Sequence, residues 1–68
     1  MEAVARVTTI TAASEKSFQD AVEKAVARAS KTLRGVTGAE IESQKVKVED
    51  GRITEYRATV NVTFILEG

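Results

Sequence analysis

Alternation in the C-terminal segment is the feature that most constrains the fold of this chain. From Tyr56 to Leu66 every second residue is apolar, and the residues between them are polar apart from Ile65. A period of two is typical of a β-strand with one buried face. The predicted strand, from Arg52 to Glu67, spans roughly 50 Å at about 3.3 Å per residue. A strand of this length needs an equally long partner to cover its apolar face.

One segment carries the spacing of an amphipathic helix. Ser17 is suited to cap its first turn, Asp20 favours the positive end of the helix dipole, and Gly35 is suited to end it. Such a helix is about 27 Å long at 1.5 Å per residue, much shorter than the predicted strand. The sequence therefore predicts that another subunit covers part of the strand. The apolar positions of the helix are Phe18, Ala21, Val22, Ala25, Val26, Ala29 and Leu33.

Two further segments have strand character. The first, from Ala3 to Thr11, is rich in Val, Thr and Ile. In the second, from Ala39 to Val48, the apolar positions change from odd to even numbers, which predicts a bulge or bend near Ser43 to Lys45. The Asp50-Gly51 pair then predicts a tight hairpin into the last strand. The sequence thus predicts an α+β fold, β-α-β-β, with a three-stranded antiparallel sheet partly wrapped around one helix. No repeat or linker divides residues 1–68, so we expect a single domain.

Composition excludes several classes of protein. The 68 residues include no Cys and no His, which excludes disulfides and the usual zinc, haem and iron–sulfur ligands. Ten basic and ten acidic residues give a formal net charge of zero, which argues against nucleic acid or a membrane surface as the main partner. Without a signal-peptide pattern or a long apolar segment, we expect a soluble, cytoplasmic protein. Because a chain this small is marginally stable alone, oligomerisation is the remaining way to bury more surface.

The order and spacing of several short features resemble the dodecin family. These features align without a gap over nearly the whole chain. They are Ser17-Phe18 at the helix start, Ala29 to Arg34 at its end, Gln44, the turn Glu49-Asp50-Gly51, and Tyr56 with the strand Val60 to Glu67. Dodecins are small β-α-β-β proteins that form hollow homododecamers, and many of them bind flavins. The resemblance implies a homododecamer here, with FMN, riboflavin or FAD as the ligand.

The residues that contact flavin in this family are changed in the present chain. Flavin-binding dodecins stack a Trp early in the second strand on the isoalloxazine ring, and a Gln after the Tyr of the third strand contacts its polar edge. Here these positions are Gly38 and Arg57. Losing a stacked aromatic costs on the order of 1 kcal/mol, twice over when symmetry-related copies sandwich the ligand. The resemblance therefore implies a pocket at Gly38, Gln44 and Arg57 with weakened affinity for flavin.

Several side chains have two open interpretations. Arg57 either presents its planar cation to a ring, a phosphate or a carboxylate, or pairs with a neighbouring Glu on an exposed strand. Gln44 either contributes to the pocket or satisfies backbone groups at the strand bend. Glu40 and Glu42 suit either acid–base chemistry or a solvated face. Because no nucleophile with an evident base accompanies them, we expect no enzyme, no catalytic residue and no metal ligand.

The predicted function is storage or sequestration of a flavin-type or other planar, anionic metabolite by a dodecin-like homo-oligomer. One alternative is a structural cage without a ligand. Another is a dodecin variant that binds a different ligand, such as a metal ion or a nucleotide-like cofactor. A cage depends only on the assembly, whereas both binding functions also depend on the pocket positions.

Overall fold

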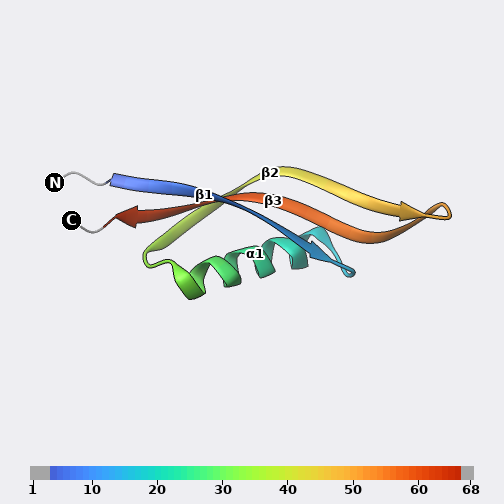
Figure 1. Ribbon diagram of the computed structural model, residues 1–68, viewed down its shortest axis with the longest axis horizontal. Helices are drawn as coiled ribbons and strands as arrows, with labels where there is room; N and C mark the ends of the chain where they lie inside the picture. The colour runs from blue at the N-terminus through green and yellow to red at the C-terminus, as the bar shows by residue number, and fades with distance from the viewer. Residues whose placement is uncertain (1–3, 67–68) are drawn as a thin grey trace.

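A three-stranded sheet and one helix make up the structure, a computed structural model that describes residues 4–66. The elements are β1 (Val4–Ser14), α1 (Phe18–Thr32), β2 (Val36–Glu49) and β3 (Arg52–Leu66). β3 is the central strand and pairs antiparallel with β1 on one side and β2 on the other. Figure 1 shows α1 along one face of the sheet, with the β2–β3 hairpin extending beyond it. The predicted β-α-β-β fold is confirmed, while the predicted strand ends Ala3 and Glu67 lie outside the described residues.

α1 begins at the predicted N-cap, Ser17, and ends before the predicted C-cap, Gly35. Ser17 is extended, and its hydroxyl accepts a hydrogen bond from the Asp20 amide at 3.0 Å. At the other end Leu33 becomes extended, and its amide donates to the Ala29 carbonyl at 2.9 Å. The prediction of Gly35 as the C-cap is therefore wrong. Gly35 has a φ of +71° and turns the chain toward β2, where a Cβ would lie 3.3 Å from the Ile65 carbonyl oxygen.

Small side chains let α1 approach the sheet closely. The buried residues of the helix are all alanines and recur every four residues along one face. Opposite them, the buried residues of β3 alternate along the strand, as the predicted period of two requires. These two rows confirm the predicted apolar faces in the middle of the molecule. The buried apolar residues are Ala21, Ala25 and Ala29 of α1 and Ala58, Val60 and Val62 of β3.

The outer strands are longer than predicted, and β2 is irregular whereas β1 is not. β1 continues to Ser14 and β2 begins at Val36, because β3 offers pairing partners along these stretches. β2 changes register between Ile41 and Ser43, so the bulge lies at Glu42, just before the predicted Ser43 to Lys45. Its effect is the predicted change from odd to even apolar positions along β2, which keeps these side chains on one face of the sheet. The alternation shows that a residue is inserted, but it does not fix which residue bulges.

The hairpin itself has the predicted turn and one further irregularity. Asp50 and Gly51 both have positive φ, at 50° and 75°, as a two-residue turn of the hairpin type requires. A register shift between Lys47 and Val48 leaves Thr54 of β3 without a partner residue in β2. The Thr54 hydroxyl instead donates to the Lys47 carbonyl at 3.4 Å. Val48 therefore pairs with Ile53, and the two apolar side chains share a face.

The molecule is long and thin. Its principal extents are 54 × 19 × 13 Å and its radius of gyration is 14.1 Å, whereas a compact chain of this length has roughly 11 Å. In Figure 1 the hairpin tip lies at one end, and the start of β1 and the end of β3 lie at the other. No helix within residues 4–66 is long and apolar enough to cross a membrane. Large hydrophobic side chains at least 40% exposed are Val4, Val7, Ile41, Val46, Val48, Ile53 and Leu66.

We expect Ala25→Leu to destabilise the fold, because its side chain is 1% exposed between α1 and β3 and leaves no room for a larger one. Overpacking of this kind typically costs about 1–3 kcal/mol in the free energy of unfolding. Urea unfolding at one fixed protein concentration measures the change, since assembly adds to the apparent stability. Ala27→Leu is the matched control, because Ala27 is exposed on the same helix. Equal stabilities of the two variants would contradict this account of the core.

Candidate ligand-binding site

The predicted site residues lie on two different faces of the sheet. Residues paired across antiparallel strands point to the same face, and neighbours along a strand point to opposite faces. Gln44 pairs with Ala58, which is buried under α1, so Gln44 belongs to the helix side. Gly38 pairs with Thr63 and Arg57 pairs with Lys45, and both pairs belong to the face that α1 does not cover. We call this second face the outer face.

One chain does not bring these residues together. On β3, Arg57 and Thr63, the partner of Gly38, are six residues apart, which corresponds to about 20 Å along the strand. Gln44 is exposed on the opposite side of the sheet, and its side chain makes no hydrogen bond within residues 4–66. A pocket that uses all of them needs residues from more than one copy of the chain.

Gly38 is surrounded by open space. A Cβ built at this position meets no atom within 4 Å. Its backbone also lacks the positive φ that Gly35 and Gly51 adopt, so the conformation does not require glycine. Position 38 therefore has room for a large side chain in this chain, but it supplies no surface on which a ring can stack.

Arg57 lies in a cationic region of the outer face. Its Nε donates to the Glu55 carboxylate at 2.5 Å, so the Glu pairing weighed from the sequence is present. Its direct partner in β2 is Lys45, and Glu55 faces Lys47. This part of the outer face, which we call the cationic face, comprises Lys45, Lys47, Arg57 and Glu55. Three cations and the Glu55 carboxylate thus share a largely exposed surface, and Lys47 also pairs with Glu49 at 3.4 Å.

The hydrogen bond from Arg57 lowers the pKa of the Glu55 carboxyl below its ordinary value, and partial burial opposes this effect. The nearby charges of Arg57 and Lys47 add to the lowering. Glu55 therefore stays ionised and neutralises part of the cationic face at neutral pH. The charge that remains can attract an anion, and the Arg57 guanidinium can present a planar, hydrogen-bonding edge to it.

The carboxylates flagged from the sequence do not form a metal site in the described chain. Glu40 pairs with Asn61 on the outer face, and Glu42 lies at the bulge of β2. Within residues 4–66 no group of three or more His, Cys, Asp or Glu side chains is placed to hold a metal ion. Thr9 donates to the Asn61 side chain at 2.8 Å, and the Thr11 and Thr59 hydroxyls lie 2.9 Å apart. These polar contacts cover the middle of the outer face.

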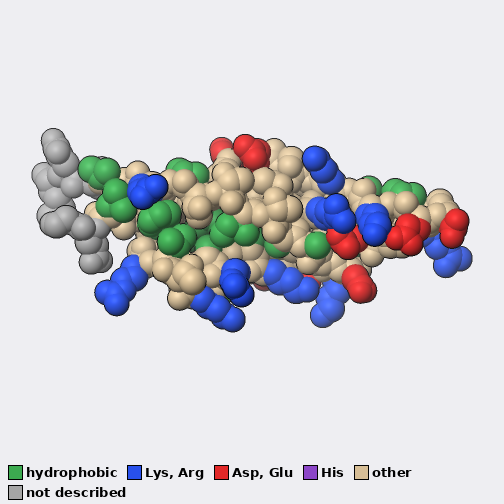
Figure 2. Space-filling model, in the orientation of Figure 1, with side chains coloured by type: hydrophobic (Ala, Val, Ile, Leu, Met, Phe, Trp, Pro, Cys, Tyr) green, Lys and Arg blue, Asp and Glu red, His purple; other side chains and the backbone are tan. Residues whose placement is uncertain are grey.

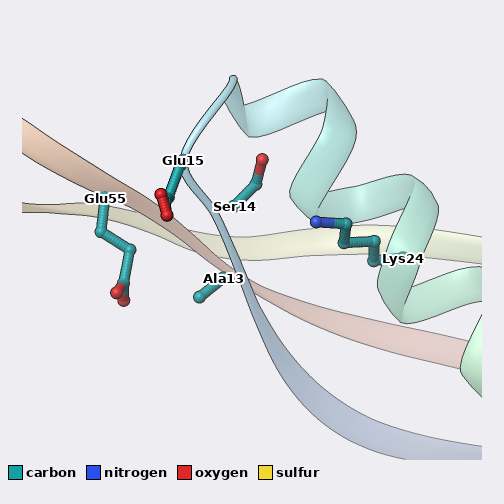
Figure 3. Close-up of a pocket in the computed structure, with 5 residues that line it drawn as sticks. All are labelled: Ala13, Ser14, Glu15, Lys24 and Glu55. Atoms are coloured by element: carbon teal, nitrogen blue, oxygen red, sulfur yellow. The ribbon is translucent and has the colours of Figure 1, made fainter.

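A pocket of about 250 Å³ near the start of α1 contains none of the predicted site residues. It is lined by Ala13, Ser14, Glu15, Lys24 and Glu55. In Figure 3 the Lys24 ammonium and the Ser14 hydroxyl point into the space beside the helix, whereas the Glu55 side chain extends away from it. The sequence analysis did not single out Ser14. Nothing in the residues around Ser14 predicts its role, since it simply follows two alanines and precedes the helix cap Ser17.

Ser14 is a structural residue of this pocket. Its side chain is buried, and its hydroxyl donates to Asp20 at 2.5 Å while accepting from the Lys16 amide at 2.9 Å. Asp20 also pairs with Lys24 at 3.2 Å. The Ser14 hydrogen bond, followed by that of Lys24, lowers the pKa of Asp20. With its hydroxyl bonded to both Asp20 and the Lys16 amide, Ser14 is held as a link between β1 and α1.

Comparison with known proteins identifies the family. The sequence model of the family described as Dodecin matches residues 4–67, almost the whole chain. The chain belongs to the dodecin family. Among solved structures, dodecin from Streptomyces coelicolor is 32% identical, with a TM-score of 0.91 over 97% of this chain and 94% of that one. Dodecin from Streptomyces davaonensis is 28% identical, with a TM-score of 0.93 over the full length of both chains.

One relative of known structure is described as calcium-chelating. The calcium dodecin of Mycobacterium tuberculosis, described with a novel calcium-binding site, is 29% identical with a TM-score of 0.81 over 94% of this chain and 91% of that one. No curated protein matches the sequence. Membership in the dodecin family implies self-association and binding of a small molecule.

We expect Arg57→Gln to raise the pKa of Glu55 toward its ordinary value, because the largest influence on that pKa is removed. A carboxyl with a lowered pKa stabilises the fold at neutral pH and loses this contribution as the pH falls through its folded pKa. The variant should therefore depend less on pH in the acidic range. A carbon-detected NMR titration of the Glu55 carboxyl measures the shift. Lys45→Gln is the control and should leave the pKa of Glu55 unchanged, whereas an unchanged value in Arg57→Gln contradicts the pairing.

Proposed function

We propose that this dodecin is a homo-oligomeric protein that stores or sequesters a planar, anionic metabolite and has weakened affinity for flavins. The observation that carries the proposal is the cationic face around Arg57. Arg57 stands at the position that the resemblance assigns to a flavin contact, and Lys45 lies directly opposite it in β2. The proposal concerns binding, without a chemical reaction, and keeps the cytoplasm as the expected location.

The charges on the cationic face favour an anion. Like charges placed directly across antiparallel strands destabilise a sheet, and Lys45 and Arg57 are such a pair. Glu55 compensates only part of their charge through its bond with Arg57. A phosphate or carboxylate group bound there would complete the compensation through charge-assisted hydrogen bonds. The Arg57 side chain is 49% exposed, so a ligand can reach it.

The aromatic residues do not fit the usual flavin stack. Phe18 and Tyr56 contact each other edge to face on the helix side, with ring centroids 5.1 Å apart. Gly38 supplies no ring on the outer face, although the space beside it is open. The residues present therefore suit a planar anion held by cations better than a flavin held between aromatic rings.

Assembly is part of the proposed function. Gly38 and Arg57 share the outer face but are about 20 Å apart in one chain, as judged from strand geometry. Exposed apolar side chains at both ends of the molecule support association with further copies. We take the homododecamer as the expected assembly, in line with the family. A ligand-free cage is the competing function, and the binding experiments below separate the two.

We expect the double substitution Gly38→Trp with Arg57→Gln to increase the affinity for riboflavin. Two stacks per ligand contribute about 2 kcal/mol together, which corresponds to roughly a 30-fold lower Kd. Quenching of riboflavin fluorescence on titration measures the gain. Gly38→Ala with Arg57→Gln is the matched control, since it restores no ring. Unquenched riboflavin with the Trp variant would show that the pocket does not lie at these positions.

We also expect the unmodified protein to prefer FMN over riboflavin. The two differ by a phosphate, and a charge-assisted hydrogen bond contributes about 1.5–3 kcal/mol, which corresponds to tenfold or more in Kd. Isothermal titration with both compounds measures the preference. Lys45→Gln with Arg57→Gln should abolish it, whereas Lys31→Gln, which removes an exposed cation on α1, should preserve it. Equal affinity of the unmodified protein for both compounds would argue against an anion site.

A further inference from the structure

One side of α1 carries cations without matching acids. Residues 24–39 contain four basic residues and no acidic one, although the whole chain has a formal net charge of zero. All four are exposed, on α1 or just beyond its end. Figure 2 shows a row of Lys and Arg side chains along the side of the molecule where Figure 1 places α1. The four residues are Lys24, Arg28, Lys31 and Arg34.

Three of these cations have no partner in the described part of the chain. Lys24 pairs with Asp20 at 3.2 Å. The ion pairs and side-chain hydrogen bonds within residues 4–66 include none with the other three. Their charge is therefore available to a ligand. We call these three residues, Arg28, Lys31 and Arg34, the basic stripe.

The helix itself accounts for only part of the stripe. Lys31 lies in the last turn, where a cation interacts favourably with the helix dipole. Arg28 lies before that turn, and Arg34 follows the end of the helix. Glu23 is five residues from Arg28, whereas helix side chains meet at three or four. Lys24 and Arg28 are like charges at a spacing of four, which destabilises a helix slightly.

The side chains of the stripe suit phosphate groups. Arg can hold a phosphate through two parallel hydrogen bonds, and Lys adds a compact point charge. Arg28 and Lys31 are three residues apart, which corresponds to about 4.5 Å along the helix axis. Because both side chains are long and flexible, neighbouring cations can contact neighbouring phosphates of one linear polymer. A row of cations of this kind favours a polymer of phosphate over a single phosphate.

The same side of α1 offers little to a nucleic acid base or an acyl chain. Bases stack on aromatic rings, and helices that bind membranes insert apolar side chains. Phe18 and Tyr56 contact each other, and Phe64 lies in β3. Ala27 is the only apolar residue that α1 exposes. An inorganic polymer, in which every group is a phosphate, therefore suits this surface better than a nucleic acid or a lipid.

We propose that the basic stripe binds inorganic polyphosphate, with its three cations on phosphates of one polymer chain. This site is separate from the cationic face around Arg57, which lies on the face of the sheet that α1 does not cover. A homo-oligomer presents the stripe several times. One long polymer can therefore contact several copies, which strengthens binding without any new contact.

Isothermal titration of the unmodified protein with medium-chain sodium polyphosphate tests the proposal. Counterion release for about three phosphate contacts predicts that the Kd rises roughly 20-fold or more when the salt concentration increases from about 50 to 200 mM. Replacing the whole stripe, as Arg28→Gln with Lys31→Gln and Arg34→Gln, should raise the Kd about tenfold or more at the lower salt concentration, because charge-assisted hydrogen bonds are lost. No binding by the unmodified protein, or unchanged binding by this variant, would overturn the site.

A second triple variant with the same change in charge is the matched control. Lys45→Gln with Lys47→Gln and Arg57→Gln removes three cations from the cationic face and should keep polyphosphate binding. The stripe variant should in turn keep the preference for FMN over riboflavin. Equal losses of polyphosphate binding in both variants would show that net charge alone drives binding. A loss in the control alone would move the site to the cationic face, and either result contradicts the proposal.

Other polyanions identify other partners. Single-stranded oligothymidylate with the same number of phosphates should bind about tenfold more weakly than polyphosphate or worse, and so should phosphatidylcholine vesicles that contain phosphatidylserine. Comparable or tighter binding of either, lost in the stripe variant, would make nucleic acid or a membrane the partner instead. Circular dichroism and native mass spectrometry check that the stripe variant is folded and assembled. If it is not, Arg28→Gln with Arg34→Gln, which keeps the cation of the last helical turn, replaces it.

Discussion

The close contact between α1 and β3 is the constraint on which the other parts of the structure depend. Alanines at every fourth position bring the helix near the sheet, and the valines of β3 fill the space between them. Both elements have 15 residues, but a helix of that length spans about 22 Å and a strand about 50 Å. One helix therefore covers only the middle of the sheet. The ends of the apolar face remain for other molecules to bury.

Local hydrogen bonds hold this contact in register. Ser14 at the end of β1 binds Asp20 in the first turn of α1, and Asp20 in turn pairs with Lys24. Ser17 caps the same turn. These contacts tie the start of the helix to the sheet at the place where Phe18 meets Tyr56. The helix is thus fixed at the base of the hairpin, and the hairpin projects from a rigid support.

The main elements could be predicted from the sequence because their signals are local. The alternation at Ala58 to Val62 and the spacing of the helix alanines each determine one buried face without reference to distant residues. The end of α1 at Leu33 could not be predicted, since Gly35 also has the properties of a cap and only its approach to Ile65 assigns it to the next turn. The bulge at Glu42 depended on pairing with β3, which the pattern of β2 alone does not contain.

The candidate site could be predicted only as a set of positions. Gly38, Gln44 and Arg57 came from the resemblance, and nothing in their spacing along the chain shows that they lie on different faces. Lys45 gained significance only once the register placed it opposite Arg57. The link formed by Ser14 was missed because a serine before a helix cap is common and its partner is six residues further on. A site formed by residues that pair across strands can be predicted only when the register of those strands is known.

Three residues, Thr37, Glu42 and Thr54, are inserted in the pairing of β2 with β3, and the last two lie closer to the hairpin tip. Each of these two breaks the alternation of its strand once, Glu42 in β2 and Thr54 in β3. The bulges absorb these extra residues, so the apolar side chains on both sides of each bulge stay on the helix side. Removing either inserted residue would leave plain alternation with the same faces, whereas removing any other residue of the strands would turn the side chains beyond it to the opposite face. The hairpin can therefore change its length by one residue at a bulge, and elsewhere its length is fixed by the alternation of faces.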